Sequence, residues 1–325
     1  MWTTPSFWYK PKSYTAYSLL PLSFLYSFIV HIRNIFTKQK KATIPVICVG
    51  NITAGGAGKT PTSIAIAKVL LEHNVKVAFI TRGYKGNTTY TTKVDLTNHR
   101  ASHVGDEAML LAQIAPVYID KNRYDAIEAA ANDGIELVIM DDGLQNPTIH
   151  KDIKILVIDG LHGIGNNYLI PAGPLRETFS SSLKKIDYII INGPDNSSLK
   201  SKIPANIPVI NVSTKIAKNL HLKDKKFIAF TGIGLPKKFF NTIEKAGGHI
   251  IKRKIFPDHY QYTVEDIKHL KTLAISHQAE LITTEKDAVR LESDQKRNII
   301  CMPIEIKLGE IFTDILIKHI RKLLP

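Results

Sequence analysis

Short apolar runs rich in β-branched residues alternate with stretches of helical periodicity over most of the chain. The runs fall at residues 46–49, 75–81, 116–119, 137–140, 153–158, 186–191 and 208–212. Helical patterns occupy several of the intervals, notably 107–113 and 123–131. Uninterrupted apolar runs are typical of parallel strands that helices cover on both faces. The pattern therefore predicts an α/β fold with a doubly wound, mostly parallel sheet over residues 41–222, and ligands at the C-terminal ends of its strands.

A second α/β pattern follows a short charged stretch at residues 223–226. Strands are predicted at 227–230, 250–255, 281–283 and 299–304, and helices at 237–246, 264–276 and 311–324. We therefore expect a smaller α/β domain over residues 223–325. Because its polar motifs follow predicted strands, we expect this domain to face the nucleotide crevice and to close over it.

Residues 1–40 have a different character. No charged side chain lies between Lys12 and Arg33, and the interval is rich in Leu, Phe, Tyr, Ile and Val. Aromatic residues precede it and basic residues follow it: Trp2, Phe7, Trp8, Tyr9, Arg33, Lys38, Lys40 and Lys41. Such flanks favour a membrane-associated helix that lies in the interface or dips into it, with the body of the protein on the cytoplasmic side. The alternative is an ordinary buried helix.

The formal charge of +14 implies an anionic partner: nucleic acid, a membrane surface or a phosphorylated substrate. No signature of a nucleic-acid-binding module accompanies the charge, so we expect no nucleic acid partner. The two cysteines, Cys48 and Cys301, give neither a disulfide framework nor a metal cluster, and they fit a reducing compartment. Nothing in the composition predicts the oligomeric state.

A glycine-rich segment joins the apolar run 46–49 to the next helical pattern. A strand, a glycine-rich turn and a helix start in this order form a phosphate-binding loop, because backbone N–H groups and the helix N-terminus point at the anion. The strict pattern has glycine where this chain has Thr53, and Gly55 and Gly56 supply the flexibility slightly later. The predicted nucleotide-binding residues are Thr53, Ala54, Gly55, Gly56, Ala57, Gly58, Lys59 and Thr60.

The apolar run 137–140 ends in two acids, Asp141 and Asp142. A carboxylate at the end of a buried strand beside a phosphate loop is suited to Mg²⁺, which Thr60 would share. Lys59 would compensate charge on the β- and γ-phosphates of ATP. Taken alone, the Asp-Asp-Gly sequence is more often a turn. Combined with the phosphate loop, it predicts a P-loop NTPase-like site with Asp141, Asp142 and Thr60 at the metal.

Several motifs, in order, resemble those of the tetraacyldisaccharide 4'-kinase family, the lipid A 4'-kinases. They are 49–61, Arg82-Gly83-Tyr84, 104–107, 141–145, 171–177, 231–234, 256–259 and 283–287. The resemblance covers almost the whole chain, and the segment 171–177 is its most specific part. Where the family usually carries Phe and His around the Asp-Asp-Gly segment, this chain has Leu144 and Asn146.

The resemblance implies Mg²⁺-dependent transfer of the γ-phosphate of ATP to the 4'-hydroxyl of a tetraacylated glucosamine disaccharide 1-phosphate, at the cytoplasmic face of the bacterial inner membrane. Such an anionic glycolipid substrate accounts for both the positive charge and the apolar N-terminus. A sugar hydroxyl needs a general base, and the resemblance assigns that role to Asp106 with His259 beside it. It also implies that Gln145, Arg176 and Glu177 contact substrate or nucleotide.

Each of these roles has a structural alternative. Asp106 precedes a helical run and could be a helix N-cap. His259 could be a loop histidine satisfied by local bonds, and Arg176 and Glu177 could form a surface ion pair.

The phosphate loop is also compatible with a different functional class, namely a P-loop switch or localisation ATPase. The additional lysine that marks such ATPases near the start of the loop is absent. A guanine-specificity string occurs at residues 92–95, but it precedes the Asp141 strand, which is too early in the chain for that role.

Overall fold

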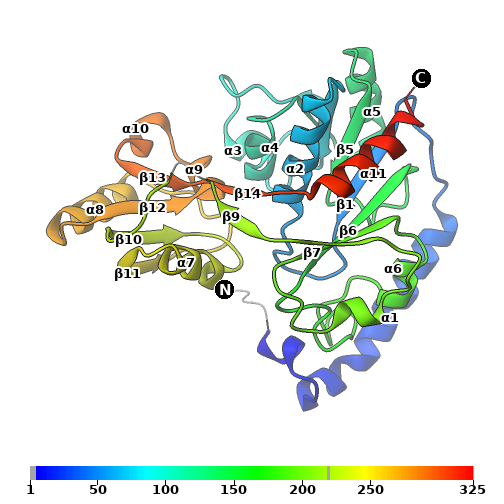
Figure 1. The fold of residues 1–325 in the computed structure, drawn as a ribbon, viewed down its shortest axis with the longest axis horizontal. Coiled ribbons are helices and arrows are strands. Elements are labelled where there is room, and N and C mark those ends of the chain that lie inside the picture. The colour runs from blue at the N-terminus through cyan, green and yellow to red at the C-terminus, as the bar shows by residue number, and fades with distance from the viewer. Residues whose placement is uncertain (1–4, 218–219, 325) are drawn as a thin grey trace.

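The computed structural model describes residues 5–217 and 220–324, so Trp2, counted above among the aromatic flank, lies outside the described residues. Figure 1 shows a larger lobe around a central sheet, with α1 along its outer edge, and a smaller lobe beside it. The eight-stranded sheet has the order β3-β4-β2-β5-β1-β6-β7-β8, and all of its pairings are parallel except that of β3 with β4. The expected doubly wound, mostly parallel sheet is confirmed.

The elements of the larger domain follow the predicted runs closely. Its strands are β1 (Val46–Gly50), β2 (Val77–Thr81), β3 (Thr92–Lys93), β4 (Val117–Ile119), β5 (Leu137–Asp141), β6 (Ile153–Asp159), β7 (Tyr188–Asn192) and β8 (Val209–Val212). Its helices are α2 (Lys59–Glu72), α3 (Ala101–Val104), α4 (Asp106–Leu111), α5 (Arg123–Asn132) and α6 (Phe179–Leu183), with a short 3₁₀ turn η2 (Leu199–Lys202). The guanine-specificity string begins in the edge strand β3, away from the sheet centre.

Helices cover both faces of this sheet, as the uninterrupted apolar runs require. Ile47 and Val49 of β1 pack in one core cluster with residues of α2. Val46 and Cys48 point the other way, into a cluster with residues of α5. Each of these four residues is at most 1% exposed to solvent. Because side chains alternate along a strand, such a run has no solvent face and reads as continuously apolar.

The smaller domain has a parallel sheet of order β11-β10-β12-β13. Its elements are β10 (Lys226–Thr231), α7 (Pro236–Lys245), β11 (His249–Ile255), α8 (Val264–Ser276), β12 (Glu280–Thr284), α9 (Glu285–Ala288), α10 (Ser293–Lys296) and β13 (Ile299–Met302). The prediction of one strand over 299–304 is wrong. Pro303 separates β13 from β14 (Ile304–Ile306), and β14 pairs instead with β9 (Thr214–Ile216) in a two-stranded antiparallel connection. A proline breaks the ladder because it has no N–H to donate.

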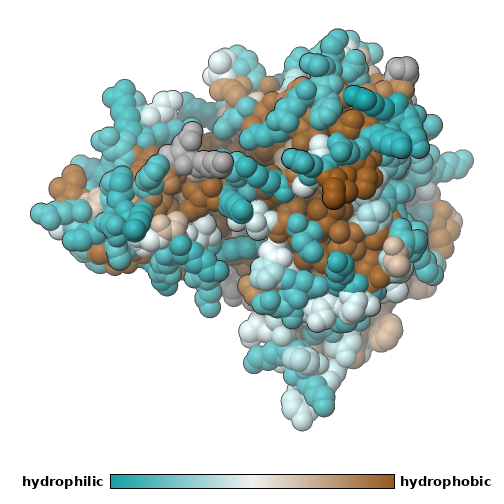
Figure 2. Space-filling view, in the orientation of Figure 1, coloured by the Kyte–Doolittle hydropathy of each residue, from teal (hydrophilic) through white to brown (hydrophobic). Residues whose placement is uncertain are grey.

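The terminal helix α11 (Glu310–Arg321) lies with the larger domain, although it falls within the range 223–325 expected for the smaller one. Phe312, Leu316 and Ile320 belong to the core cluster of the large sheet. The Tyr188 hydroxyl of β7 and His319 Nδ1 are 2.9 Å apart. Figure 2 shows apolar atoms gathered on this face around α11, where Ile311 and Ile315 are exposed.

The N-terminal region consists of a 3₁₀ turn η1 (Ser6–Tyr9) and the helix α1 (Tyr14–Phe36). The helix has 23 residues, and it is long and apolar enough to cross a membrane by length and composition. Only 6% of its most apolar window is buried, so the alternative of an ordinary buried helix is wrong. Large side chains are exposed along it, with Phe24 at 73% and Phe28 at 62%.

One narrow face of α1 is fixed to the larger domain by polar contacts. The Ser23 hydroxyl donates to Leu169 O at 2.8 Å and accepts from the Ala172 N–H at 3.1 Å. The Tyr26 hydroxyl donates to Arg176 O at 3.0 Å. Since segment 169–176 also borders the phosphate loop, this docking connects the exposed apolar helix to the site.

Candidate active site

The phosphate loop connects β1 to α2, and two features fix its shape. Gly58 has φ +94°, and a Cβ there would lie 2.4 Å from Asn192 Nδ2, so neither the backbone nor the space admits a side chain. The Asn51 side chain donates to Thr53 O at 2.7 Å and to Gly55 O at 3.3 Å. These bonds hold loop carbonyls on the side of Asn51, which leaves the other side of the loop for N–H groups.

The segment 171–177 packs against the start of the loop. The Ala54 N–H donates to Pro174 O at 2.7 Å, and Thr53 forms an antiparallel bridge with Leu175. The Arg176 N–H donates to Ile52 O at 2.7 Å. The Ala54 N–H is therefore already bonded, and the Ala57 N–H donates to Gly55 O at 3.2 Å. The N–H groups that can meet a phosphate are those of the loop glycines and of the start of α2.

Lys59, the first residue of α2, lies between two oxygens. Its Nζ is 3.2 Å from Asn51 Oδ1 and 3.4 Å from Asp142 Oδ2, and its side chain is 14% exposed. These contacts hold the ammonium group at the mouth of the loop, where it can reach phosphate oxygens.

Thr60 and Asp141 lie together because β1 and β5 are neighbours in parallel register, with Val49 opposite Asp141. The Thr60 hydroxyl donates to Asp141 Oδ2 at 3.0 Å, and the Ser63 hydroxyl donates to Oδ1 at 2.9 Å. Burial raises the pKa of Asp141 to about 6, helped by the charge of Glu107 and opposed by that of Lys59. A buried carboxylate with a raised pKa is one that a nearby cation would stabilise.

The oxygens of Thr60 and Asp141 are close enough to reach one cation. Within residues 5–217 and 220–324, no group of three or more His, Cys, Asp or Glu side chains could hold a metal by themselves. A single carboxylate beside a hydroxyl suits Mg²⁺, which proteins commonly hold through one or two carboxylates together with substrate phosphates and water.

Asp142 heads a second polar group that includes the three predicted contact residues. Arg176 Nη1 donates to Asp142 Oδ1 at 3.0 Å and to Gln145 Oε1 at 3.4 Å. Gln145 Nε2 donates to Asn51 O at 2.9 Å and to Glu177 Oε1 at 3.0 Å. Arg176 and Glu177 are thus not a surface pair with each other, because each is bonded into the network at the loop.

Asp106, the first residue of α4, meets His259 from the smaller domain. The Asp106 Oδ2 to His259 Nδ1 distance is 2.7 Å, and the Asp106 side chain is 4% exposed. Its Oδ1 accepts from the Glu107 N–H at 2.9 Å, so the carboxylate bonds to the helix start with one oxygen and to His259 with the other. Burial raises the pKa of Asp106, but the His259 hydrogen bond and the charges of Arg290, His259 and Lys286 outweigh it and hold the pKa well below its usual range.

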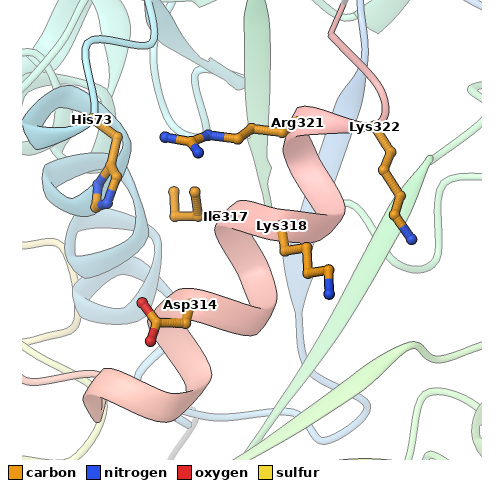
Figure 3. Close-up of a pocket in the computed structure, with 6 residues that line it drawn as sticks. All are labelled: His73, Asp314, Ile317, Lys318, Arg321 and Lys322. Carbon is orange, nitrogen blue, oxygen red and sulfur yellow. The ribbon is translucent and has the colours of Figure 1, made fainter.

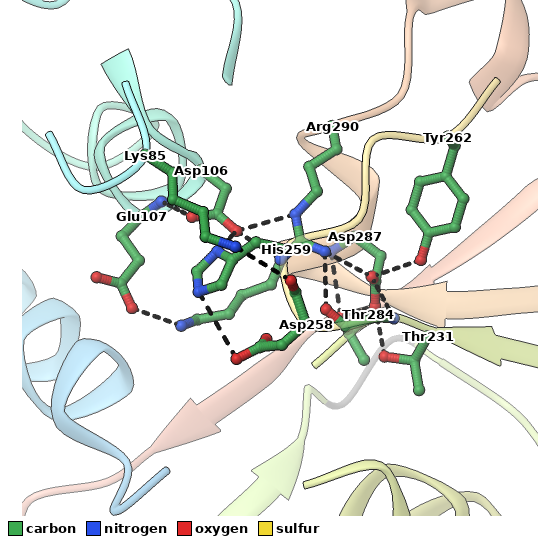
Figure 4. A network of polar contacts seen from close by, with 12 residues as sticks. Lys85, Asp106, Glu107, Thr231, Asp258, His259, Tyr262, Thr284, Asp287 and Arg290 are labelled. Atoms are coloured by element: carbon green, nitrogen blue, oxygen red, sulfur yellow. Dashed lines mark hydrogen bonds and ion pairs between the residues drawn. The ribbon is translucent and has the colours of Figure 1, made fainter. Parts of the chain in front are cut away.

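His259 occupies an unusual backbone position. Its φ is +61°, and its N–H donates to Gly232 O at 3.0 Å. The ring is 14% exposed and meets the Tyr84 ring edge-on at a centroid distance of 5.5 Å. Figure 4 shows the imidazole lying between the loop of the smaller domain and Asp106. His259 is therefore not a histidine satisfied by local bonds alone.

The sequence reasoning missed several residues that the structure brings to the site. Ser63 lies one turn after Thr60 on the same face of α2, a spacing that could have identified it. Arg290 bonds to Asp106, and its spacing from that partner gives no pattern that could have identified it. Lys286, whose Nζ is 2.6 Å from Glu107 Oε1, lies in the segment 283–287 that the sequence singled out, but without a role for this residue.

A surface cavity of about 510 Å³ lies elsewhere, between the end of α2 and α11. Figure 3 shows its lining residues: His73, Asp314, Ile317, Lys318, Arg321 and Lys322. The phosphate loop is at the opposite end of α2, about 20 Å away along the helix. The cavity is therefore not part of the site.

The chain matches known proteins over nearly its whole length. The family model described as tetraacyldisaccharide-1-P 4'-kinase matches residues 15–321. The tetraacyldisaccharide 4'-kinase of Paramagnetospirillum magneticum is 39% identical over 304 residues, which cover 93% of this chain and 93% of the relative. That of Parvibaculum lavamentivorans is 40% identical over 294 residues, which cover 88% and 86%.

A solved structure matches as well. The crystal structure of LpxK from Aquifex aeolicus in complex with ATP has a TM-score of 0.77 at 27% identity, and the match covers 95% of this chain and 99% of that one.

Proposed function

This chain belongs to the tetraacyldisaccharide-1-P 4'-kinase family, and we propose from that premise how its residues carry out the reaction. The enzyme transfers the γ-phosphate of ATP to the 4'-hydroxyl of a tetraacylated glucosamine disaccharide 1-phosphate in lipid A biosynthesis. The main support for the roles given to the residues is the 3.0 Å contact between Thr60 Oγ1 and Asp141 Oδ2 at the end of the phosphate loop.

The later part of the loop binds the triphosphate. The N–H groups that follow Gly55 and the N-terminus of α2 supply donors and partial positive charge. Lys59 exchanges its contacts with Asn51 and Asp142 for the β- and γ-phosphate oxygens. Its charge opposes the negative charge that develops on these oxygens during transfer.

Thr60 and Asp141 are the residues that would hold Mg²⁺, and their hydroxyl and carboxylate oxygens suit this ion. When bound, Mg²⁺ neutralises charge on the β- and γ-phosphates. Asp142 lies next to this pair and holds Lys59 and Arg176 in place. Ser63, through its 2.9 Å bond to Asp141 Oδ1, fixes the orientation of the carboxylate.

The Asp106 and His259 pair acts as the general base for the sugar hydroxyl. The two side chains are 2.7 Å apart and come from different domains, so the base is complete only when the smaller domain is seated. We treat the pair as one unit that accepts the proton, because strongly interacting groups titrate together. The smaller domain thus closes over ATP and supplies His259 at the same time.

Arg176, Gln145 and Glu177 contact the acceptor on the other side of the loop. Arg176 is tied to Asp142 through its side chain and to Tyr26 of α1 through its carbonyl. It therefore lies between the nucleotide and the apolar helix, where a lipid with a phosphorylated head group would approach.

The exposed face of α1 rests in the membrane interface at the cytoplasmic face of the inner membrane. Its polar face is fixed to the body of the protein through Ser23 and Tyr26, so the helix is held along its side rather than free to cross the bilayer. Phe24 and Phe28 face away, and basic residues follow the helix. Apolar burial and attraction to anionic lipids both favour this placement.

Incubation with γ-labelled ATP and Mg²⁺, with and without the tetraacyldisaccharide 1-phosphate, tests the function. We expect label on the lipid and little hydrolysis without acceptor. Hydrolysis at the same rate without acceptor would favour a P-loop switch instead. Thr60→Val, which keeps the shape of the side chain and removes the hydroxyl, should reduce transfer and raise the Mg²⁺ concentration needed for half activity.

A further inference from the structure

Arg290 is the most completely buried cation in the joint between the two domains. It follows α9, and its side chain is 0% exposed. Its Nε and Nη2 donate to Asp106 Oδ2 at 2.9 and 2.5 Å, so the guanidinium approaches the carboxylate with two of its nitrogens. Its Nη1 donates to Gly232 O at 2.9 Å and to Asp287 Oδ1 at 3.0 Å.

The core of the smaller domain holds this guanidinium rigidly. Asp287 is fully buried and accepts hydrogen bonds from the hydroxyls of Thr231, Tyr262 and Thr284, at 2.6, 2.7 and 2.6 Å. It also accepts the Gly232 N–H at 2.8 Å. Figure 4 shows these side chains converging on Asp287 behind the arginine. A side chain whose partners are themselves locked is preorganised, and it cannot follow Asp106 if that carboxylate moves.

Gly232 links Arg290 to His259. Its carbonyl accepts both the Arg290 Nη1–H and the His259 N–H. A Cβ at Gly232 would lie 2.7 Å from Pro257 O, so the backbone passes through without room for a side chain. Arg290 and His259 therefore share one anchor in the smaller domain, and both reach Asp106 Oδ2 from it.

We propose that Arg290 is a third member of the base unit: a positioning residue, supplied by the smaller domain, that fixes the Asp106 carboxylate against His259. It does not touch the acceptor. Its action goes through Asp106, which it holds ionised and in one orientation as long as the smaller domain is seated. This inference rests on the proposed role of the Asp106 and His259 pair.

A purely structural pair in the same joint looks different. Arg100 and Glu292 also link the two domains, with Nη1 and Oε1 2.7 Å apart, but their side chains are 70% and 59% exposed. Exposed pairs of this kind contribute little, and neither member contacts Asp106 or His259. Arg100→Gln is therefore the matched control, because it removes an arginine from the joint without changing the charge beside the base.

The pH dependence of activity distinguishes positioning from mere support. The charged and titratable groups around the unit are Asp258 beside His259, Glu107 and Lys286 beside Asp106, Tyr84 against the ring, and Lys85, whose Nζ contacts Asp258 O. All of these stay in place in an Arg290 variant. Loss of the arginine charge alone stabilises the protonated form of the unit, so the acid limb of the rate profile moves to higher pH.

The experiment measures kcat and KM from pH 5 to 9 for Arg290→Gln, Arg290→Lys, Arg100→Gln, Asp106→Asn and the double variant Asp106→Asn with Arg290→Gln. We expect Arg290→Gln to lower kcat roughly 10²-fold with KM for ATP near that of the unchanged protein, and to move the acid limb up by about one pH unit. Arg290→Lys, which keeps the charge, should keep the limb and recover part of the rate. Arg100→Gln should match the unchanged protein.

The double variant gives the decisive comparison. If Arg290 acts through Asp106, its activity equals that of Asp106→Asn alone. Two results would overturn the inference without affecting the proposed Asp106 and His259 base. One is a double variant whose loss of kcat equals the product of the two single losses, and the other is an acid limb that does not move in Arg290→Gln. If Asp106→Asn is instead fully active, the proposed role of Asp106 in the general base is wrong. If Arg290→Gln does not accumulate as folded protein, Arg290→Lys combined with Asp106→Asn provides the same comparison.

Discussion

The two halves of the site are built in different ways. The nucleotide half, Lys59, Thr60 and Asp141, belongs to a single sheet, and backbone pairing between β1 and β5 sets its geometry. The base half, Asp106, His259 and Arg290, crosses two domains, with Arg290 184 residues from Asp106 along the chain. The first lies within one sheet of the larger domain. The second draws its residues from both domains.

The cations of the two halves differ in how they are solvated, although Asp141 is as buried as Asp106. Lys59 retains 14% exposure of its side chain, whereas Arg290 has none and Asp106 has 4%. A buried charge that loses its partner costs far more free energy than a partly exposed one. Substitution of Lys59 should therefore affect activity with little effect on folding, and substitutions in the base half should affect both.

The largest effect on rate is expected from Lys59→Met. Loss of the charge opposite the transferring phosphate should lower kcat by about 10³-fold, because such interactions act mainly in the transition state. The midpoint of thermal unfolding should stay close to that of the unchanged protein. Acceptor-dependent transfer and thermal unfolding, measured side by side, check this. A large fall in the unfolding midpoint would remove the contrast between the two halves.

Asp106→Asn should show both effects. We expect kcat to fall about 10²-fold, since a general base contributes at least this much. The free energy of unfolding should fall by about 3 kcal/mol, because the buried Arg290 charge loses one of its two carboxylate partners and keeps only Asp287. Urea unfolding measures the second effect. Asp294→Asn, at a side chain 91% exposed, is the control and should change neither quantity.

The apolar helix gives a test outside both halves. Phe24→Ser combined with Phe28→Ser removes two exposed rings and should weaken binding to vesicles of anionic phospholipid about tenfold or more. Turnover of a water-soluble, short-chain acceptor should be unaffected. Leu71→Ser, at an exposed residue of α2, is the matched control. Equal binding by all three proteins would mean that α1 does not rest on the bilayer.

The smallest expected effect is a loss of folding stability at low pH. The pKa of Asp106 in the folded protein is lower than its unfolded value of about 3.9, because His259 and Arg290 stabilise the carboxylate. The stability it contributes is therefore present above about pH 4 and is lost as the pH falls below that value. Urea unfolding at pH 3 and pH 6 should show this loss in the unchanged protein and a smaller one in Asp106→Asn. Asp141 in the nucleotide half acts in the opposite direction, since burial raises its pKa.

Much of the fold follows from the sequence because it depends on short-range patterns. Continuous apolar runs predicted the strands of both sheets except the short edge strand β3, and the helical period predicted 264–276 as it is found. The pattern failed at residues 299–304, where one apolar run serves two sheets across Pro303. Hydrophobicity records that a residue is buried, but not which sheet it joins.

The site likewise has parts that follow from local sequence patterns and parts that depend on contacts between distant segments. The glycine-rich turn between β1 and α2 and the acid at the end of β5 could be predicted from adjacent residues, because each is a local run in the chain. Three contacts could be seen only in three dimensions: Arg290 reaches Asp106, Arg176 pairs with Asp142 rather than Glu177, and α11 packs on the larger domain. These contacts depend on the docking of elements distant in the chain, and the spacing between such residues carries no periodic signal.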